Sequence, residues 1–391
     1  MVDTSRARRR LDASPYADST NAIFTELCSA IFTQLPRSDQ RRKAVRYLRG
    51  LLGAQGRKTV RNIAAAQGVH ATEQNLHHFI SDSTWDWVPV RQALARHLAR
   101  IAPPHAWVVH PMTIPKAGAG SVGVGRRFSA AHGQSFNGQQ AVGVWGASDA
   151  MSSPFNWRLH LSGPWLDDGP RRSRASIPEE AALETLVDCA VGTYAEMAAG
   201  WDVPVRPVVL DARELDPMPI FRTLRATGAP VLARVTAGLR LIAADPALRG
   251  YGAEVRSAHH LLGAATGRRR PVAQTRDGPV VTTVRVRAPV PVGGSRRATG
   301  SEGLILLGTG GAGGHWPAEL WLTDLTDAQP ATVLRLSRLV QRVDRDFAEI
   351  ADRVGIRDFV GRSFTGWHRH VTLASAAHAV VALTDAFGET T

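Results

Sequence analysis

Cysteine is scarce in this sequence, since only Cys28 and Cys189 occur among its 391 residues. Two cysteines cannot build a disulfide scaffold or a cysteine-rich zinc site, and their scarcity is typical of a reducing cytosol. Long hydrophobic runs are also missing, because no segment approaches the roughly 20 uncharged apolar residues of a membrane helix. The beginning of the chain lacks the pattern of a signal peptide. We therefore expect a soluble cytoplasmic protein with no membrane partner.

Acidic residues are outnumbered. The chain has 34 Asp and Glu against 47 Lys and Arg, which leaves a formal net charge of +13 and a pI of about 11.0. A surface this positive attracts polyanions, and nucleic acid is the usual candidate. Apolar residues make up 44% and charged residues 21%, which excludes a wholly disordered or fibrous chain. The length allows two or three domains.

The first hundred residues read as helical, because apolar residues recur there at helical spacing. Two of the segments form a short pair around Gly68 with the spacing of a helix-turn-helix. Helices are predicted over residues 23–35, from an N-cap at Ser38-Asp39 to residue 52, and over 58–66, 72–80 and 89–101. We expect residues 1–20 to be a basic flexible tail and residues 21–104 to be a helical DNA-binding domain.

After residue 104 the pattern changes to short β-like runs separated by Gly and Ser, followed by a long predicted helix and a buried strand that ends at Asp211. This order indicates an α/β sheet with its site at the strand ends. We divide the rest of the chain into a first core part (105–240), an inserted β-rich region (241–318) and a second core part with C-terminal helices (319–391). The predicted elements are strands over 107–109, 121–128, 140–145, 207–210, 230–235, 282–287 and 319–322, helices over 178–197, 221–226, 331–354 and 367–383, and a flexible hairpin or loop over 308–314.

Two acids from distant parts of the chain are candidate metal ligands. Asp211 ends the buried strand, and Asp344 lies on the long helix near the C-terminus. Such a pair can share a divalent cation, as phosphoryl-transfer sites require. Asp211 can equally cap the following turn, and Asp344 can form a surface ion pair, so spacing alone leaves both interpretations open.

A series of motifs in one order resembles DDE-type transposases of bacterial insertion sequences. The motifs are Arg46–Leu52 (RYLRGLL), Trp85–Arg91 (WDWVPVR), Trp107–Val109 with Pro115-Lys116, Ser121–Phe128 (SVGVGRRF), Asn156–Leu161 through Pro178–Glu180, Val208–Asp211, and Gly361–Ser363 with Gly366–His370. The resemblance implies an RNase H-like mixed sheet with flanking helices, a β-rich insertion and an N-terminal helical domain. It also implies metal-dependent cutting and joining of double-stranded DNA.

The resemblance places the catalytic triad at His110, Asp211 and Asp344. The family has two adjacent acids where this chain has His110-Pro111, and a glutamate where this chain has Asp344. Mg²⁺ prefers hard oxygen ligands, a neutral imidazole removes one negative charge, and Asp has a shorter reach than Glu. We therefore expect an impaired nuclease that binds neither Mg²⁺ nor Mn²⁺ tightly, with Asp211 and Asp344 as the ligands if a metal binds.

A second interpretation of the triad is a site of two carboxylates and one histidine for Mn²⁺, Fe²⁺ or Zn²⁺. The remaining histidines, including His77-His78, His97 and His105, lack ligand spacing and are expected on the surface or in the core. Trp367–His370 is expected to pack as the beginning of a helix, although Arg369 could contact a phosphate.

Basic residues form the predicted DNA contact. If they share one face they neutralise several phosphates, whereas each one alone is more simply a solvated side chain. The candidates are Arg41, Arg42, Lys43, Arg46, Arg49, Arg57, Lys58, Arg61, Lys116, Arg126 and Arg127. Side chains that could reach base edges from the short helix pair are Asn62, Gln74, Asn75 and His77.

Three functions remain open. The leading one is a domesticated transposase that binds DNA, with a regulatory role, after losing efficient cleavage. The second is an active transposase, and the third is a small-molecule enzyme that has reused a pocket at His110 and Asp211. The resemblance also suggests a homodimer associated with the nucleoid.

Overall fold

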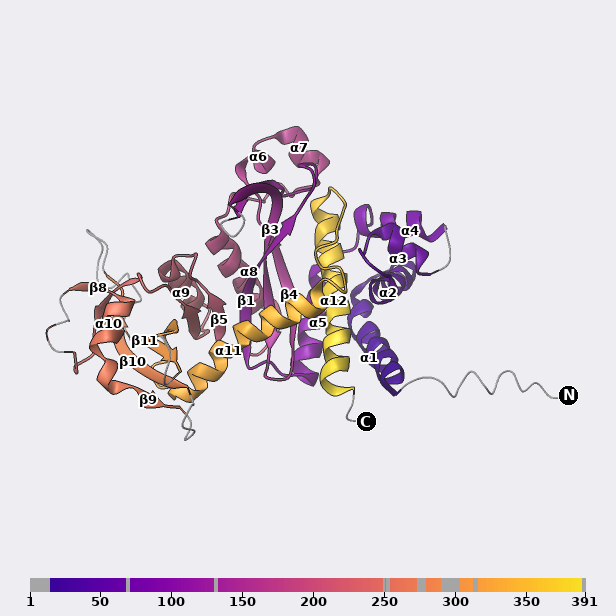
Figure 1. The fold of residues 1–391 in the computed structure, drawn as a ribbon. Helices are drawn as coiled ribbons and strands as arrows, with labels where there is room; N and C mark the ends of the chain where they lie inside the picture. The colour runs from indigo at the N-terminus through magenta and orange to yellow at the C-terminus, as the bar shows by residue number, and fades with distance from the viewer. Residues whose placement is uncertain are drawn as a thin grey trace.

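One mixed sheet runs through most of the molecule. The computed structural model describes residues 15–67, 71–129, 133–248, 250, 254–272, 279–289, 303–311 and 316–388, and it places twelve strands of these ranges in a single sheet. The order is β2-β3-β1-β5-β6-β12-β11-β10-β7-β8, with β4 also paired to β3 and β9 to β10. Figure 1 shows the helical domain and the β-rich region at opposite ends, with the central strands between them.

The central strands confirm the expected RNase H-like α/β fold. They are β1 (Ala106–Pro115), β2 (Gly125–Ser129), β3 (Gln134–Ala147), β4 (Ser152–Leu159), β5 (Val208–Asp211) and β6 (Val231–Arg234). β1, β3 and β4 pair antiparallel, whereas β5 and β6 run parallel to β1. The parallel strands β5 and β6 are joined by helix α9 (Pro217–Ala226), because a parallel pair needs a crossover.

The β-rich region continues this sheet instead of forming a second one. Its elements are β7 (Arg240–Ala243), β8 (Val255–Ser257), α10 (Ala258–Ala264), the 3₁₀ turn η3 (Thr266–Arg268), β9 (Arg270–Pro271), β10 (Val280–Arg287) and β11 (Leu304–Gly310). β12 (Glu319–Thr323) pairs with β11 on one side and with β6 on the other, which confirms the predicted return to the main sheet. Residues 308–310 belong to β11, so the predicted loop is wrong there, and residues 312–314 lie outside the described ranges.

The N-terminal helices lie close to their predicted positions. They are α1 (Pro15–Ile31), the 3₁₀ turn η2 (Phe32–Gln34), α2 (Ser38–Gly53), α3 (Val60–Ala65), α4 (Ala71–Ser81) and α5 (Val88–Ile101). α1 begins at Pro15, inside the range assigned to the tail, and residues 1–14 are not described. The turn between α3 and α4, which includes Gly68, also falls outside the described residues.

Other helices differ at their ends from the predictions. α6 (Gly163–Leu166) and α7 (Gly169–Arg174) are short, and α8 (Leu186–Gly200) begins eight residues later than the predicted 178, because Thr185 and Asp188 form a capping box. The α-helix α11 (Pro330–Asp346) continues as a π-helical segment, η5 (Phe347–Ala351), and does not run to residue 354. Residues 121–124 precede β2 without strand structure.

The last helix, α12 (Phe364–Phe387), lies in the middle of the molecule. By length and composition it could cross a membrane, but 78% of the relevant window is buried inside the protein. Every residue from Gly366 to Val380 is buried, because the helix packs on β4 on one side and on α1 and α2 on the other. In Figure 1 it stands between the sheet and the N-terminal helices. α12 is therefore a core helix.

Candidate active site at the sheet edge

Two residues of the predicted triad, His110 and Asp211, lie on neighbouring strands of the sheet. Val109 of β1 pairs with Leu210 of β5 in the parallel register, so His110 and Asp211 follow side by side on adjacent strands. β5 ends at Asp211, and the carboxyl ends of parallel strands are where α/β sheets place their sites. Helix α11 packs across β1 and β5.

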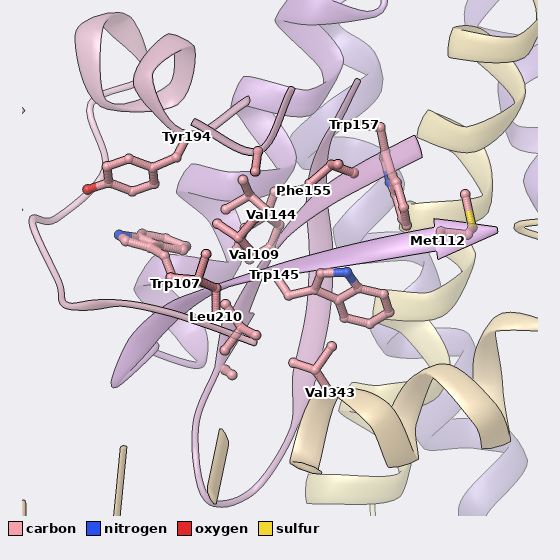
Figure 2. Packing of buried hydrophobic residues seen from close by; sticks show 14 of the residues in the cluster. Trp107, Val109, Met112, Val144, Trp145, Phe155, Trp157, Tyr194, Leu210 and Val343 are labelled. Atoms are coloured by element: carbon pink, nitrogen blue, oxygen red, sulfur yellow. The ribbon is translucent and has the colours of Figure 1, made fainter. Parts of the chain in front are cut away.

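The third residue of the predicted triad, Asp344, lies on α11, the helix that packs on β1 and β5. Val343 is fully buried and lies beside Trp145 of β3 (Figure 2), which fixes the helix on the sheet. Asp344 follows and directs its carboxylate at β1. His110 Nε2 lies 3.1 Å from Asp344 Oδ1. The structure therefore brings His110 and Asp344 into direct contact, as an ion pair or hydrogen bond between residues far apart in the sequence.

The two nitrogens of the His110 ring have different surroundings, since Nε2 faces Asp344 and Nδ1 is buried. Its Nδ1 is buried without a hydrogen-bond partner, and the ring packs near Trp145 and Phe347, with centroids 6.1 and 5.1 Å away. In the neutral ring that donates Nε2–H to Asp344, the lone pair is on the buried Nδ1. In the protonated ring there is no lone pair. The imidazole is packed beside the acid in either state.

Asp211 is held by arginines. Arg213 Nε lies 2.9 Å from Oδ1 and 3.0 Å from Oδ2, and Arg213 Nη2 lies 2.6 Å from Oδ2. Arg234 Nη1 is 3.8 Å from Oδ2. Burial raises the pKa of Asp211, but the hydrogen bonds and positive charge of Arg213 outweigh it and leave the pKa below its ordinary value. Asp211 is therefore a carboxylate at neutral pH.

The residues at this edge do not fit a divalent metal. Within the described part of the chain, no group of three or more His, Cys, Asp and Glu side chains could hold one. His110 Nε2 is engaged with Asp344, and both oxygens of Asp211 already accept hydrogen bonds from Arg213. The arrangement therefore does not support the interpretation as a site for Mn²⁺, Fe²⁺ or Zn²⁺.

Comparison with known proteins identifies a family for this chain. The family model described as DDE superfamily endonuclease matches residues 30–288. The chain belongs to this family. A search of curated proteins finds no match. Membership implies a DNA substrate, and nucleases of the DDE superfamily generally use divalent metals.

The predicted DNA-binding arginines of α2 gather on one groove. Arg41, Arg42, Arg46 and Arg49 line a cavity of about 440 Å³ between α1 and α2, together with the apolar Phe32 and other residues. All four arginines are exposed. Three have intramolecular contacts: Arg41 Nε donates to Leu35 O at 2.8 Å, Arg42 Nη1 donates to Ser38 Oγ at 3.5 Å, and the Arg49 guanidinium lies 5.1 Å from the ring centroid of Phe24. The groove gives this DDE-family chain a positive surface outside the triad region.

Two other predicted DNA contacts, Lys58 and Lys116, bond backbone carbonyls. Lys58 is buried, and its Nζ donates to Ala54 O. Lys116 Nζ donates to Phe359 O at 2.6 Å, and burial lowers the pKa of Lys116 to about 8. Each ammonium group thus bonds a backbone carbonyl, and DNA contact by Lys58 and Lys116 stays a prediction.

The remaining basic candidates differ in their surroundings. Lys43 lies 3.5 Å from Asp39, Arg57 lies 3.6 Å from Asp358, and Arg127 Nη2 lies 3.2 Å from His160 Nδ1. Arg57, Arg61 and Arg126 are exposed.

In the candidate helix-turn-helix, α3 and α4, one predicted base-contact residue bonds within the protein and three are exposed. Asn62 Nδ2 donates to Arg57 O at 2.8 Å, so this side chain holds the preceding turn. On α4, Gln74, Asn75 and His77 are exposed together. Base contact stays a prediction for these α4 residues, whereas Asn62 is used internally.

The other histidines and Arg369 are structural or exposed, as expected. His97 is buried, His105 lies 3.6 Å from Asp149, and His77 and His78 flank Asp82. Arg369 Nε donates to Trp85 O at 3.0 Å and its Nη1 to Ile80 O at 3.1 Å. The packing interpretation of this arginine is confirmed.

Sequence reasoning missed the arginines around Asp211. A signal existed for Arg213, since an arginine two residues after a strand-terminal acid can fold back on it. No local signal existed for Arg234 or Glu319, which meet at 2.8 Å only because β6 pairs with β12.

Proposed function

We propose that the protein binds double-stranded DNA through its N-terminal helical domain and cuts it inefficiently or not at all. One observation carries the second half: His110 Nε2 contacts Asp344 at 3.1 Å at the position where a two-metal nuclease needs anionic oxygens around its cations. An imidazole bonded to Asp344 supplies no anionic oxygen there to hold a pair of divalent cations.

DNA binding is supported by the groove between α1 and α2 and by the exposed side of α4. The four groove arginines can neutralise phosphates, which makes binding depend steeply on salt. Gln74 and Asn75 are side chains that hydrogen-bond adenine edges in the major groove. In a helix-turn-helix, the second helix, here α4, lies in the major groove of DNA.

On this proposal the protein is a domesticated transposase of insertion-sequence origin with a regulatory role. Its positive charge keeps it with the nucleoid in the cytoplasm. A homodimer fits the proposal, because a dimer reads two half-sites at once and multiplies the phosphate contacts.

The test combines a binding assay with a nicking assay. Duplex sites are selected from a random library by the full-length protein, and binding is measured across a salt series. The selected duplex is then incubated with wild type and Mg²⁺ or Mn²⁺. We expect salt-dependent binding without metal-dependent nicking. Nicking that is abolished in Asp211→Ala would show instead an active transposase.

The groove is tested by Arg46→Ala and Arg49→Ala against Arg222→Ala, an equally exposed arginine on α9. Each groove variant should reduce the slope of log affinity against log salt by about 1, whereas Arg222→Ala should leave it unchanged. Equal slopes in all three variants would contradict the assignment of this groove.

A further inference from the structure

Asp211 forms an ion pair with the guanidinium group of Arg213. Arg213 supplies its backbone N–H at 3.1 Å and its Nε at 2.9 Å to Oδ1, and its Nε at 3.0 Å and Nη2 at 2.6 Å to Oδ2. Side-on guanidinium–carboxylate pairing of this kind is among the stronger hydrogen-bonded arrangements in proteins. The Asp211 side chain is 25% exposed and the Arg213 side chain 51%, so solvent screens the outer side of the pair.

The neighbouring strands β6 and β12 add a second arginine, Arg234, and a second carboxylate, Glu319. Arg234, opposite Asp211 in the β5–β6 register, lies between the Asp211 carboxylate and Glu319, with Nη2 2.8 Å from Glu319 Oε1. Glu319 also accepts hydrogen bonds from Trp321 Nε1 at 3.1 Å and Gln341 Nε2 at 3.5 Å. The two carboxylates at this end of β5 and β12 are therefore matched by two guanidinium groups.

A metal ion would have to displace Arg213 to reach Asp211. Mg²⁺ binds carboxylate oxygen at about 2.0–2.1 Å. An ion at that distance from either Asp211 oxygen would lie within a few ångströms of the guanidinium, and it would face electrostatic repulsion from it. The replacement of the family's first acid by His110 is therefore not the only feature that opposes metal binding.

We propose that Arg213 is a resident cation that excludes divalent metals from the Asp211 side of the site, independently of His110. This inference rests on the proposed loss of cleavage and adds a second determinant to it. Its consequence is specific. Restoring the family's acid by His110→Asp alone leaves Asp211 engaged with Arg213, and metal affinity returns only when the guanidinium is also removed.

The test measures Mn²⁺ binding to the full-length protein without DNA, by loss of the free Mn²⁺ signal in electron paramagnetic resonance. The key comparison is His110→Asp against the double variant His110→Asp/Arg213→Gln. We expect the double variant to bind Mn²⁺ at least about tenfold more tightly, the range over which groups adjoining metal ligands change affinity. His110→Asp/Arg213→Lys should bind as weakly as His110→Asp, because the charge beside Asp211 remains.

A matched control removes a similar arginine elsewhere. Arg268 Nη1 lies 2.9 Å from the buried Asp245 in the β-rich region, and His110→Asp/Arg268→Gln should match His110→Asp. Arg213→Ser replaces Arg213→Gln if the latter does not fold. Equal affinity of His110→Asp and the double variant, or equal affinity of the Lys and Gln variants, would overturn the role of Arg213. Failure of the proposed function has a separate signature, namely metal-dependent nicking by wild type.

Discussion

At the scale of single residues, Arg91 on α5 is a buried cation with several hydrogen-bond partners. It is fully buried, and its guanidinium donates to Thr372 Oγ1 at 2.7 Å, Asn156 Oδ1 at 2.9 Å and Trp157 O at 3.0 Å, with His368 Nδ1 at 3.0 Å. Burial lowers the pKa of Arg91 to about 9. One side chain thus joins α5, β4 and α12 through neutral partners.

Replacing Arg91 should therefore be costly. Arg91→Ala leaves several buried acceptors without a donor, and each such loss costs about 1–3 kcal/mol. We expect a loss of at least about 3 kcal/mol in the free energy of unfolding, measured by urea denaturation. Arg96→Ala, at an exposed position of the same helix, should change it by less than about 0.5 kcal/mol. Similar losses in the two variants would show that the buried network contributes little.

A second prediction concerns pH and His378. This ring is buried against Trp145, its Nε2–H donates to Asp346 O at 3.3 Å, and its Nδ1 has no partner. Burial lowers its pKa to about 4. The unfolded state therefore binds the proton between about pH 6.5 and pH 4 and the native state does not, so this stabilising contribution is complete above pH 6.5 and is lost as the pH falls towards 4.

The measurement is the free energy of unfolding across that interval for wild type and His378→Asn. Removing the ring should take away about 3 kcal/mol of the acid-dependent loss. The exposed His78→Asn serves as a control and should keep the wild-type slope. An unchanged slope in His378→Asn would mean that the native state binds the His378 proton as readily as the unfolded state does.

The role of a residue can be predicted from the sequence when it depends on a local pattern or motif, but not when it depends on a contact with a distant segment. His110, Asp211 and Asp344 were identified because motif order gave their positions, and Arg369 because a helical pattern surrounded it. The internal use of Lys58 and Lys116 could not be read from the sequence. Each bonds a carbonyl whose position depends on the folded chain, and for Lys116 that carbonyl belongs to distant Phe359.

At the scale of elements, local patterns predicted most of the fold. Helices α2, α4 and α5 and strands β5, β6 and β12 lie within a few residues of their predicted ranges, because apolar periodicity and strand-bounding residues are local properties. The pairing of β12 with both β6 and β11 depends on contacts between distant segments, so the continuous sheet could not be predicted in detail.

The late start of α8 has a local cause in the pair Thr185 and Asp188. Thr185 Oγ1 accepts from Asp188 N at 3.1 Å, and Thr185 N donates to Asp188 Oδ2 at 2.9 Å. Thr185→Ala should lower the free energy of unfolding by about 1 kcal/mol, read from thermal or urea denaturation. Thr332→Ala, an exposed threonine in the first turn of α11, is the control and should have a smaller effect. The reverse order would contradict the capping role of Thr185.

At the scale of the whole molecule, α12 contacts both the N-terminal helices and the sheet, which the predicted domain division assigns to separate parts. α12 packs on β4 of the sheet and on α1, α2 and α4. Tyr47 of α2 lies 2.8 Å from His370 Nδ1, and Arg369 bonds the carbonyls at the end of α4. The sequence places α12 at the far end of the chain, so only the fold reveals that the N-terminal helices depend on it.

This shared helix predicts that the two parts unfold together. A helical unit without α12 would expose the apolar side chains that α12 covers, and burial of each such side chain contributes about 1.5–3 kcal/mol. Hydrogen exchange of the full-length protein, followed by mass spectrometry at increasing urea, should show peptides from α2 and β1 losing protection at the same concentration. Peptides from β8 and α10, at the opposite end of the molecule in Figure 1, provide the internal comparison. Loss of protection in α2 at a clearly lower urea concentration than in β1 would mean that the N-terminal helices unfold independently of the sheet, and that α12 belongs to the core alone.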